Sequence, residues 1–243
     1  ARLIAWPARA VQALTLRAAL AGIPYRCGEF VVAAHGEHRL QALDIHTQAG
    51  LHRLDCDYLA IGYGLVPNVE LAQLLGCRLE TDARHARIAT DNVQRTSVAN
   101  VYAAGEVCGI GGCAAARIEG RIAGLAAAGS AQVHGTLRLR LRHARRFAEL
   151  LAARFELDER IRSLAAPDTV ICRCEDVTMA ALEPYRDARE AKLATRCGMG
   201  ACQGRICGAA LTELRRFSSA QIRPPLFPAR LASLSEPFSI KNP

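Results

Sequence analysis

Several patterns are scarce in this chain of 243 residues, and each scarcity argues against a class of protein. No apolar run reaches the roughly 20 residues that a membrane-spanning helix needs. The first residues lack the long apolar core of a secretory signal. Aromatic residues make up only 5% of the chain, and no nucleic-acid-binding motif accompanies the net charge of +8. We therefore expect a protein with no membrane span that does not bind nucleic acid.

Cysteine, in contrast, is abundant, with ten residues in the chain. In a chain without a secretory signal, this number favours a reducing cytoplasm and ligand cysteines over disulfides. Half of the ten lie between positions 172 and 207. We expect a cytoplasmic protein with a metal site in this stretch, and buried structural thiols or disulfides are the simpler alternative.

Four of these cysteines form two close pairs, Cys172 with Cys174 and Cys202 with Cys207. No histidine follows His143, so thiolates are the strong soft ligands on offer. Four thiolates suit a [2Fe–2S] or [4Fe–4S] cluster or a structural zinc ion, although a gap of one residue is unusual for zinc. We take the two pairs as the ligands. Cys197, five residues before Cys202, is interpreted as a packing residue near the metal.

A second pattern with chemical meaning is a short apolar stretch, residues 101–104, followed by Gly105, Glu106 and a glycine-rich loop. Gly105 lets a ligand approach the backbone, and Glu106 can accept hydrogen bonds from sugar or ribityl hydroxyls. The helix predicted from about Gly112 offers free N–H groups to a phosphate or an anionic ring. A tight strand-to-helix turn is the structural alternative. The near match to a GxGxxG fingerprint at residues 109–114 is rejected, because no second strand with a terminal acid follows.

Hydrophobic periodicity, together with the glycines and prolines that end helices and strands, predicts the remaining elements. The predicted helices are residues 8–21, 69–75, 114–128, 136–165, 179–185, 187–194 and 205–217, and the predicted strands are residues 3–6, 25–34, 38–47, 51–56, 58–61 and 101–104. The basic run at residues 138–146 is interpreted as a solvated helix face, with docking on an acidic partner subunit as the alternative. The last 26 residues contain five of the ten prolines and no glycine, so we expect an extended tail.

Two sets of motifs resemble known families. Residues 172–178 (CRCEDVT) and 195–207 (TRCGMGACQGRIC) resemble the bacterioferritin-associated-ferredoxin-like (BFD-like) [2Fe–2S] domain. Residues 59–68 (LAIGYGLVPN) and 96–107 (TSVANVYAAGEV) resemble the pyridine nucleotide-disulfide oxidoreductase fold. The combination is similar to the alpha subunits of the opine oxidase, (hydroxy)proline dehydrogenase and hydrogen cyanide synthase group. Position 197 departs from the alanine expected at that place.

The resemblance implies an α/β fold, namely the C-terminal part of a flavoprotein with two dinucleotide-binding domains, followed by a small all-α [2Fe–2S] helix-turn-helix module. The glycine fingerprints that bind the ADP half of FAD and the nicotinamide-type cofactor are absent, so the chain is expected to match the C-terminal half of such a subunit, as a fragment or a truncated gene product. The expected divisions are the end of the NAD-type domain at 1–65, the FAD-binding part at 66–135, a connecting helix at 136–168, the cluster domain at 169–217 and the tail at 218–243.

The resemblance also implies function. It implies FAD contacts at Gly105, Glu106, Gly112 and Cys113, and cluster ligation by Cys172, Cys174, Cys202 and Cys207. The expected role is that of an oxidoreductase subunit that passes electrons from amine or amino-acid oxidation (opine, proline-like or glycine) to an acceptor, together with a second flavoprotein (beta) subunit. A non-catalytic [2Fe–2S] electron-transfer or docking module without flavin is the alternative, and a zinc-stabilised interaction protein is a third. No catalytic residue is identified.

Overall fold

The computed structural model describes residues 5–82, 85–130, 135–217, 222, 224, 226–227 and 229–235. The chain divides into two compact units. Unit 1 comprises residues 1–63 and 157–164, and unit 2 comprises residues 64–156 and 165–243. The predicted strand at residues 3–6 falls largely outside the described residues. No described helix combines the length and apolar character needed to cross a bilayer.

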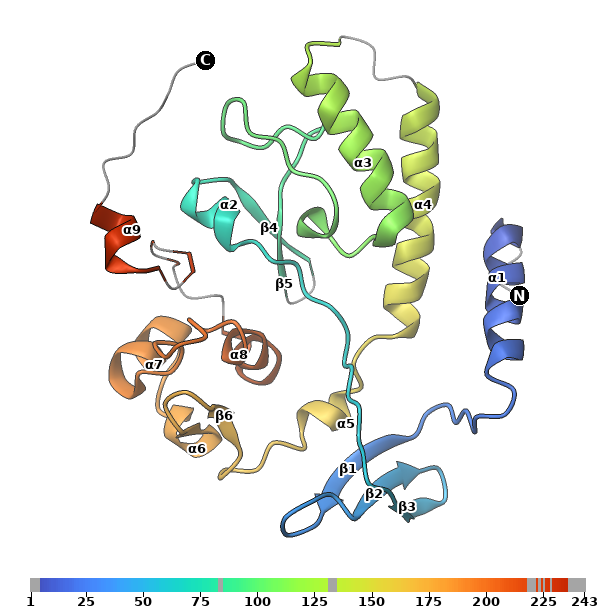
Figure 1. Ribbon diagram of the computed structural model, residues 1–243, viewed down its shortest axis with the longest axis vertical. Helices are drawn as coiled ribbons and strands as arrows, with labels where there is room; N and C mark the ends of the chain where they lie inside the picture. Colours follow the sequence, from blue (N-terminus) through green and yellow to red (C-terminus); the bar gives the residue numbers. More distant parts are fainter. Residues whose placement is uncertain are drawn as a thin grey trace. The chain divides into compact units, whose positions relative to one another are not determined.

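Unit 1 contains a helix and a small antiparallel sheet (Figure 1). Helix α1 (Pro7–Ala19) begins with proline at a first-turn position, where the missing N–H costs nothing. The sheet has the order β1–β2–β3, and its strands are β1 (Phe30–His35), β2 (Ala42–Thr47) and β3 (Gly50–Asp55). Helix α5 (Glu159–Arg162) belongs to this unit because the Arg160 guanidinium lies over the Phe30 ring, 5.0 Å from its centroid.

The first part of unit 2 combines a short hairpin with two long helices. It contains α2 (Glu70–Leu74), the hairpin of β4 (Leu79–Asp82) and β5 (His85–Ile88), the 3-10 turn η2 (Glu106–Cys108), α3 (Gly112–Ala127) and α4 (Gly135–Arg154). Helices α3 and α4 lie side by side (Figure 1). They share a core in which Ala115 and Ile122 of α3 meet Leu137 and Leu141 of α4.

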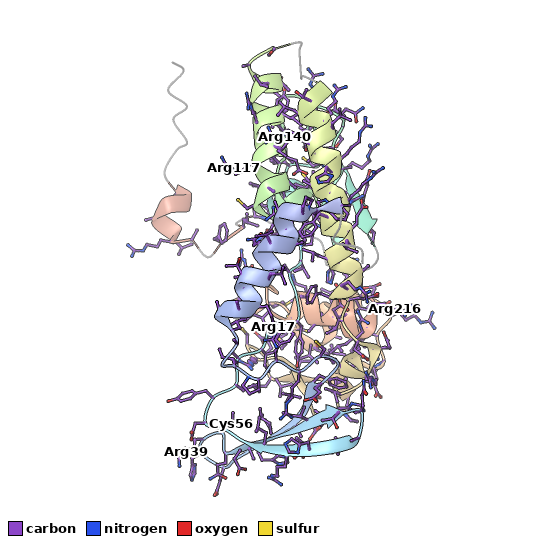
Figure 2. The ribbon with its side chains drawn as sticks, turned by 90° about the vertical axis from the view of Figure 1, so that its right-hand side faces the viewer. Arg17, Arg39, Cys56, Arg117, Arg140 and Arg216 are labelled. Atoms are coloured by element: carbon purple, nitrogen blue, oxygen red, sulfur yellow. The ribbon has the colours of Figure 1, made fainter. Side chains whose placement is uncertain are left out.

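The arginine side chains of α3 and α4 mostly extend into solvent, as Arg117 and Arg140 do in Figure 2. On α4 the leucines at 137 and 141 are buried, whereas Arg138, Arg140 and Arg142 are exposed. The basic run is therefore the polar face of an amphipathic helix, as predicted. Docking on an acidic partner stays a prediction.

The cysteine-rich end of unit 2 is a small module with its own core, which we call the cysteine module (residues 169–217). Its elements are β6 (Val170–Cys172), β7 (Val177–Thr178), α6 (Met179–Leu182), α7 (Ala188–Thr195) and α8 (Cys207–Arg215). Leu182 and Ala191 are fully buried in a cluster that also includes Leu211 and Phe217. Helix α9 (Leu231–Ser235) follows in the tail.

Several sequence predictions are wrong in detail. Residues 58–61 form no strand and are mostly exposed, and residues 101–104 contribute only an isolated bridge between Tyr102 and Arg95. A buried parallel strand needs neighbours on both sides. Among the described residues, 58–61 have no paired strand, and 101–104 pair on one side only, with residues 94–96. The hairpin β4–β5 was not predicted, since its strands are only four residues long and partly polar.

Three further predictions need correction. The connecting helix predicted within residues 136–168 is two helices, because α4 ends at Arg154 and Asp158 begins α5 by accepting a hydrogen bond from the Arg160 N–H. The module is not all-α, since β6 and β7 form a two-stranded ribbon. The tail is not wholly extended, since α9 lies within it. The predicted domain boundaries otherwise stay predictions.

Candidate functional site

The structure gathers three thiols at the centre of the cysteine module. The sulfur atoms of Cys172, Cys197 and Cys207 all lie within 4.8 Å of one another. Each residue is at most 2% exposed. Cys172 ends β6, Cys197 follows α7, and Cys207 begins α8, so three separate elements converge on one point. We call these three residues the inner thiols.

The other two cysteines of the stretch form a second pair, which we call the outer thiols. The Cys174 thiol lies close enough to the Cys202 sulfur to help lower the pKa of Cys202. Cys174 is exposed and Cys202 is partly buried. All four predicted ligands therefore lie in the module. Of each predicted pair, one cysteine is an inner thiol (Cys172 or Cys207) and the other is an outer thiol (Cys174 or Cys202).

Backbone N–H groups and neighbouring thiols set the pKa values here. The Ile206 N–H donates to the Cys202 sulfur and lowers its pKa, against the opposing effect of burial. Cys207 has a raised pKa because of its hydrogen bond with Cys197, with burial adding to the shift, whereas the same bond lowers the pKa of Cys197. Thiols this close to one another cannot all ionise without a cation between them.

Glycines allow the two cysteine loops to meet. A Cβ atom on Gly200 would lie 2.1 Å from the Cβ of Cys174, so only glycine fits there. Gly198 and Gly204 adopt positive φ values of 83° and 80° and face each other across the loop. A salt bridge from Arg196 Nε to Glu175 Oε2, 2.8 Å long, also joins the loops. These contacts hold the loop that carries Cys174 against the loop that carries Cys197 and Cys202.

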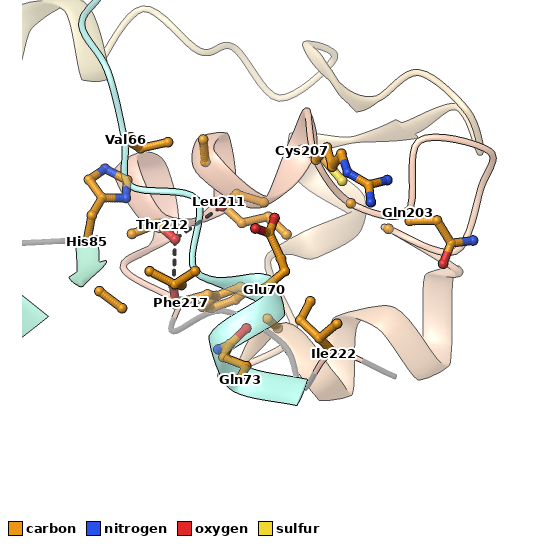
Figure 3. Close-up of a pocket in the computed structure, with 18 of the residues that line it drawn as sticks. Val66, Glu70, Gln73, His85, Gln203, Cys207, Leu211, Thr212, Phe217 and Ile222 are labelled. Carbon is orange, nitrogen blue, oxygen red and sulfur yellow. Dashed lines mark hydrogen bonds between the residues drawn. The ribbon is translucent and has the colours of Figure 1, made fainter. Parts of the chain in front are cut away.

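A cavity of about 730 Å³ adjoins the inner thiols (Figure 3). Cys197 and Cys207 belong to its wall, α2 contributes Glu70, and α8 contributes Leu211. One carboxylate oxygen of Glu70 is buried and has no hydrogen-bond partner among the described residues. Two of the three inner thiols therefore border this cavity, whereas Cys174 is exposed to solvent.

The second candidate region is the loop at residues 105–112, which leads into α3. Gly105, Gly109 and Gly112 all have positive φ values, between 70° and 120°. No side chain caps the N-terminus of α3, where Gly112 and Cys113 are located. Glu106 is exposed. The uncapped start of α3 at Gly112 and Cys113 and the exposed Glu106 carboxylate are thus accessible polar groups at this loop.

The sequence prediction missed the residue that holds this loop. Glu119 on α3 is only 4% exposed and accepts a 2.8 Å hydrogen bond from the Gly105 N–H. Its other oxygen accepts two bonds from Arg145 of α4, at 3.1 and 2.9 Å. Glu119 lies on the buried stripe of α3 with Ala115 and Ile122, so an acid on an apolar helix face was the available signal.

Comparisons with known proteins bear on the first part of the chain and on its overall family. Residues 3–132 match the family model described as pyridine nucleotide-disulphide oxidoreductase. The chain is 31% identical over 233 residues to an opine oxidase subunit of Agrobacterium tumefaciens, covering 84% of this chain and 46% of that protein. It is 34% identical over 221 residues to hydrogen cyanide synthase subunit HcnB of Pseudomonas aeruginosa, covering 81% of this chain and 48% of that protein.

One solved structure has the same fold over most of the chain. The crystal structure of L-proline dehydrogenase from P. horikoshii superposes with a TM-score of 0.62 at 19% identity, covering 84% of this chain and 44% of that one. The chain thus spans about half the length of the relatives that it matches. The likeness supports the α/β flavoprotein fold expected from the sequence.

Proposed function

Since the chain belongs to the pyridine nucleotide-disulphide oxidoreductase family, we propose that it is part of an FAD- and [2Fe–2S]-containing subunit of a heteromeric oxidoreductase. The observation that carries the proposal is the convergence of the inner and outer thiols in one small module, downstream of a flavoprotein-type glycine loop. The match to proteins whose names call them oxidase and synthase subunits supports a multi-subunit enzyme.

The thiols fit a [2Fe–2S] cluster held by Cys172, Cys174, Cys202 and Cys207. Each iron of such a cluster takes two thiolates, and the module offers an inner and an outer set. The Ile206 N–H, the largest of the effects that lower the pKa of Cys202, stabilises negative charge on its sulfur. A cluster and FAD, when bound, supply single-electron and two-electron transfer respectively.

The chain's own residues then have positioning roles. Glu119 holds the Gly105 backbone, so that the loop and the start of α3 face the flavin. Glu106, Gly112 and Cys113 would contact the FAD, as the resemblance implies. Gly198, Gly200 and Gly204 let the cysteine loops close around the metal. The cavity beside Cys207 gives an electron donor or acceptor room to approach the inner thiols.

We propose amines or amino acids of the opine, proline or glycine type as the substrate class of the whole enzyme, since the relatives bear the names opine oxidase and hydrogen cyanide synthase. Oxidation of the substrate is assigned to a second flavoprotein subunit. This chain would receive the electrons and pass them to an acceptor. The proposal leaves the catalytic residues of the amine oxidation outside this chain.

Anaerobic purification followed by counting of bound cofactors tests the proposal. We expect about two iron atoms and two labile sulfides per chain, with FAD released on denaturation. Stoichiometric zinc without labile sulfide would contradict the cluster. Iron and sulfide without any FAD, even after incubation with FAD, would favour a non-catalytic electron-transfer module. That second candidate has its own support, because the cysteine module has a hydrophobic core of its own.

A further inference from the structure

Cys197 is not needed by the four-ligand cluster, yet the structure places it among the ligands. Its side chain is 2% exposed, and its sulfur lies within 4.8 Å of the sulfurs of Cys172 and Cys207. The inner thiols are thus three where a four-thiolate cluster needs two at this position. The outer pair has no such third member: among the described residues, only the inner thiols form a group of three possible ligands.

The local backbone explains why Cys197 points to the module centre. Arg196 has a left-handed conformation, with φ 64°, and its N–H donates to the Lys192 carbonyl to end α7. The Cys197 N–H then donates to Thr195 Oγ1 at 3.2 Å. Gly198 follows with φ 83°, so the chain reverses on both sides of Cys197 and directs its side chain inward. Its place next to a glycine also leaves the backbone room to adjust.

The distances allow Cys197 to exchange with a ligand. Metal–thiolate bonds are about 2.3 Å long, so two sulfurs on one tetrahedral metal lie about 3.8 Å apart. All three inner sulfurs are within 4.8 Å of one another, so any two of them can bind one metal after a shift of about 1 Å. A plain packing role would require only a small apolar side chain, such as the alanine expected at this position.

We propose that Cys197 is a spare ligand, which binds the inner metal in place of Cys207 or Cys172 when either is lost. In the exchange, the Cys197 sulfur forms the metal–sulfur bond and its proton passes to solvent. The inference rests on the proposed function for the identity of the metal centre. It predicts an asymmetry: loss of an inner ligand is tolerated, and loss of an outer ligand is not.

The test compares five variants of the full chain, purified anaerobically: Cys207→Ala, Cys172→Ala, Cys202→Ala, Cys197→Ala and the Cys197→Ala/Cys207→Ala double variant. Iron, labile sulfide and visible circular dichroism are measured for each. We expect Cys202→Ala to lose iron about tenfold and Cys207→Ala to keep roughly half of it, with an altered dichroism spectrum that reports the new ligand. Cys197→Ala should keep its iron, and the double variant should fall to the level of Cys202→Ala. Cys172→Ala serves as the matched second inner variant.

The outcomes separate the two proposals. Suppose that the wild-type chain holds a cluster but Cys207→Ala and Cys172→Ala lose as much iron as Cys202→Ala. This result would overturn the spare-ligand proposal and leave the proposed function unchanged. Loss of the fold in both inner variants, seen by far-ultraviolet circular dichroism, counts against the spare ligand in the same way. If the wild-type chain holds zinc, the proposed function fails, and the zinc contents of the same variants decide the inference. A chain that binds no metal overturns both.

Discussion

The cysteine module and the glycine loop at residues 105–112 are both candidate cofactor sites, but they are built in opposite ways. The module brings together side chains from one stretch, residues 172–207, over a core that includes the fully buried Leu182 and Ala191. The loop offers mainly backbone N–H groups, and its geometry depends on Glu119 and Arg145, which lie on two later helices.

This difference indicates which kind of cofactor site can form completely within one segment of a longer chain. Ligands close in sequence fold together with their own core, so the module presents all of its thiols at once. A nucleotide site in an α/β fold is assembled from strand ends and helix N-termini that lie far apart in the sequence. The described chain provides one such loop and one such helix, with the carboxylate of Glu106 beside them.

The largest difference between the two regions is expected from a substitution in the hydrophobic core of the cysteine module. Leu182 is fully buried, so Leu182→Ala should cost about 2–5 kcal/mol of local stability. We expect amide hydrogen exchange to accelerate by roughly 30-fold to 4,000-fold in peptides from 169–217, as measured by mass spectrometry. Peptides from α3 are the internal control. Equal acceleration there would show that the two regions unfold together, although each has a core of its own.

The cysteine site was largely predictable because its signal is local. The spacing of Cys172, Cys174, Cys202 and Cys207 needs no knowledge of distant contacts, and the structure places all four in one module. Their roles as ligands remain a prediction. The position of Cys197 was open, since spacing alone does not show that Arg196 turns the chain at the end of α7 and directs the thiol inward.

The strands, the helix break and the role of Glu119 were less predictable, because each depends on residues that are distant in the sequence or on a local capping contact. Residues 58–61 and 101–104 have the apolar composition of buried strands. Among the described residues, the first has no paired strand and the second has only the bridge to Arg95, so neither forms a ladder. The break between α4 and α5 depends on the N-cap of Asp158, which a continuous amphipathic pattern conceals. Glu119 was missed because its partners, Gly105 and Arg145, are adjacent only in the folded chain.

Two thiols of the glycine-loop region, Cys108 and Cys113, should differ in reactivity. Cys108, within the glycine loop, has a pKa raised to about 11, first by burial and then by the charge of Glu119. Compared with a thiol whose pKa has the ordinary value of 9.0, its thiolate fraction at pH 8 is lower by about 100-fold. Because the thiolate is the reactive form, alkylation by iodoacetamide should be slow at about pH 8 and should rise about tenfold per pH unit until the pH approaches about 11.

Peptide mass spectrometry measures this profile, with the exposed Cys113 on the same chain as the reference. If Cys108 reacts as fast as Cys113 at about pH 8, water reaches the Cys108 thiol freely and the predicted contrast is wrong. Glu119→Gln should lower the pKa of Cys108 by removing the smaller of the two raising effects. An unchanged profile in this variant would leave burial as the whole cause.

The glycine loop should become less stable when the carboxylate of Glu119, which holds the Gly105 backbone, is removed. Glu119→Ala leaves the Gly105 N–H and the Arg145 guanidinium without their acceptor, so we expect a loss of about 2 kcal/mol around residues 103–112. Faster hydrogen exchange in this segment is the measurement. Metal content should not change, because Gly105 and Arg145, which Glu119 joins, both lie outside the cysteine module. A loss of iron in Glu119→Ala would show that the two sites depend on each other.

The smallest effect is expected at the N-cap of α7, the helix that leads to Cys197. Asp187 accepts hydrogen bonds from the N–H groups of Arg189 and Glu190, at 2.8 and 2.9 Å. Asp187→Ala should therefore cost about 1 kcal/mol, and Asp187→Asn, which can also cap, only a few tenths. Exchange of the α7 amides should accelerate about fivefold in the alanine variant and hardly at all in the asparagine variant. Equal effects of the two substitutions would mean that charge near the helix N-terminus, rather than the capping bond, stabilises α7. In that case added salt should weaken wild-type α7 as well, since exposed charge interactions are screened and capping bonds are not.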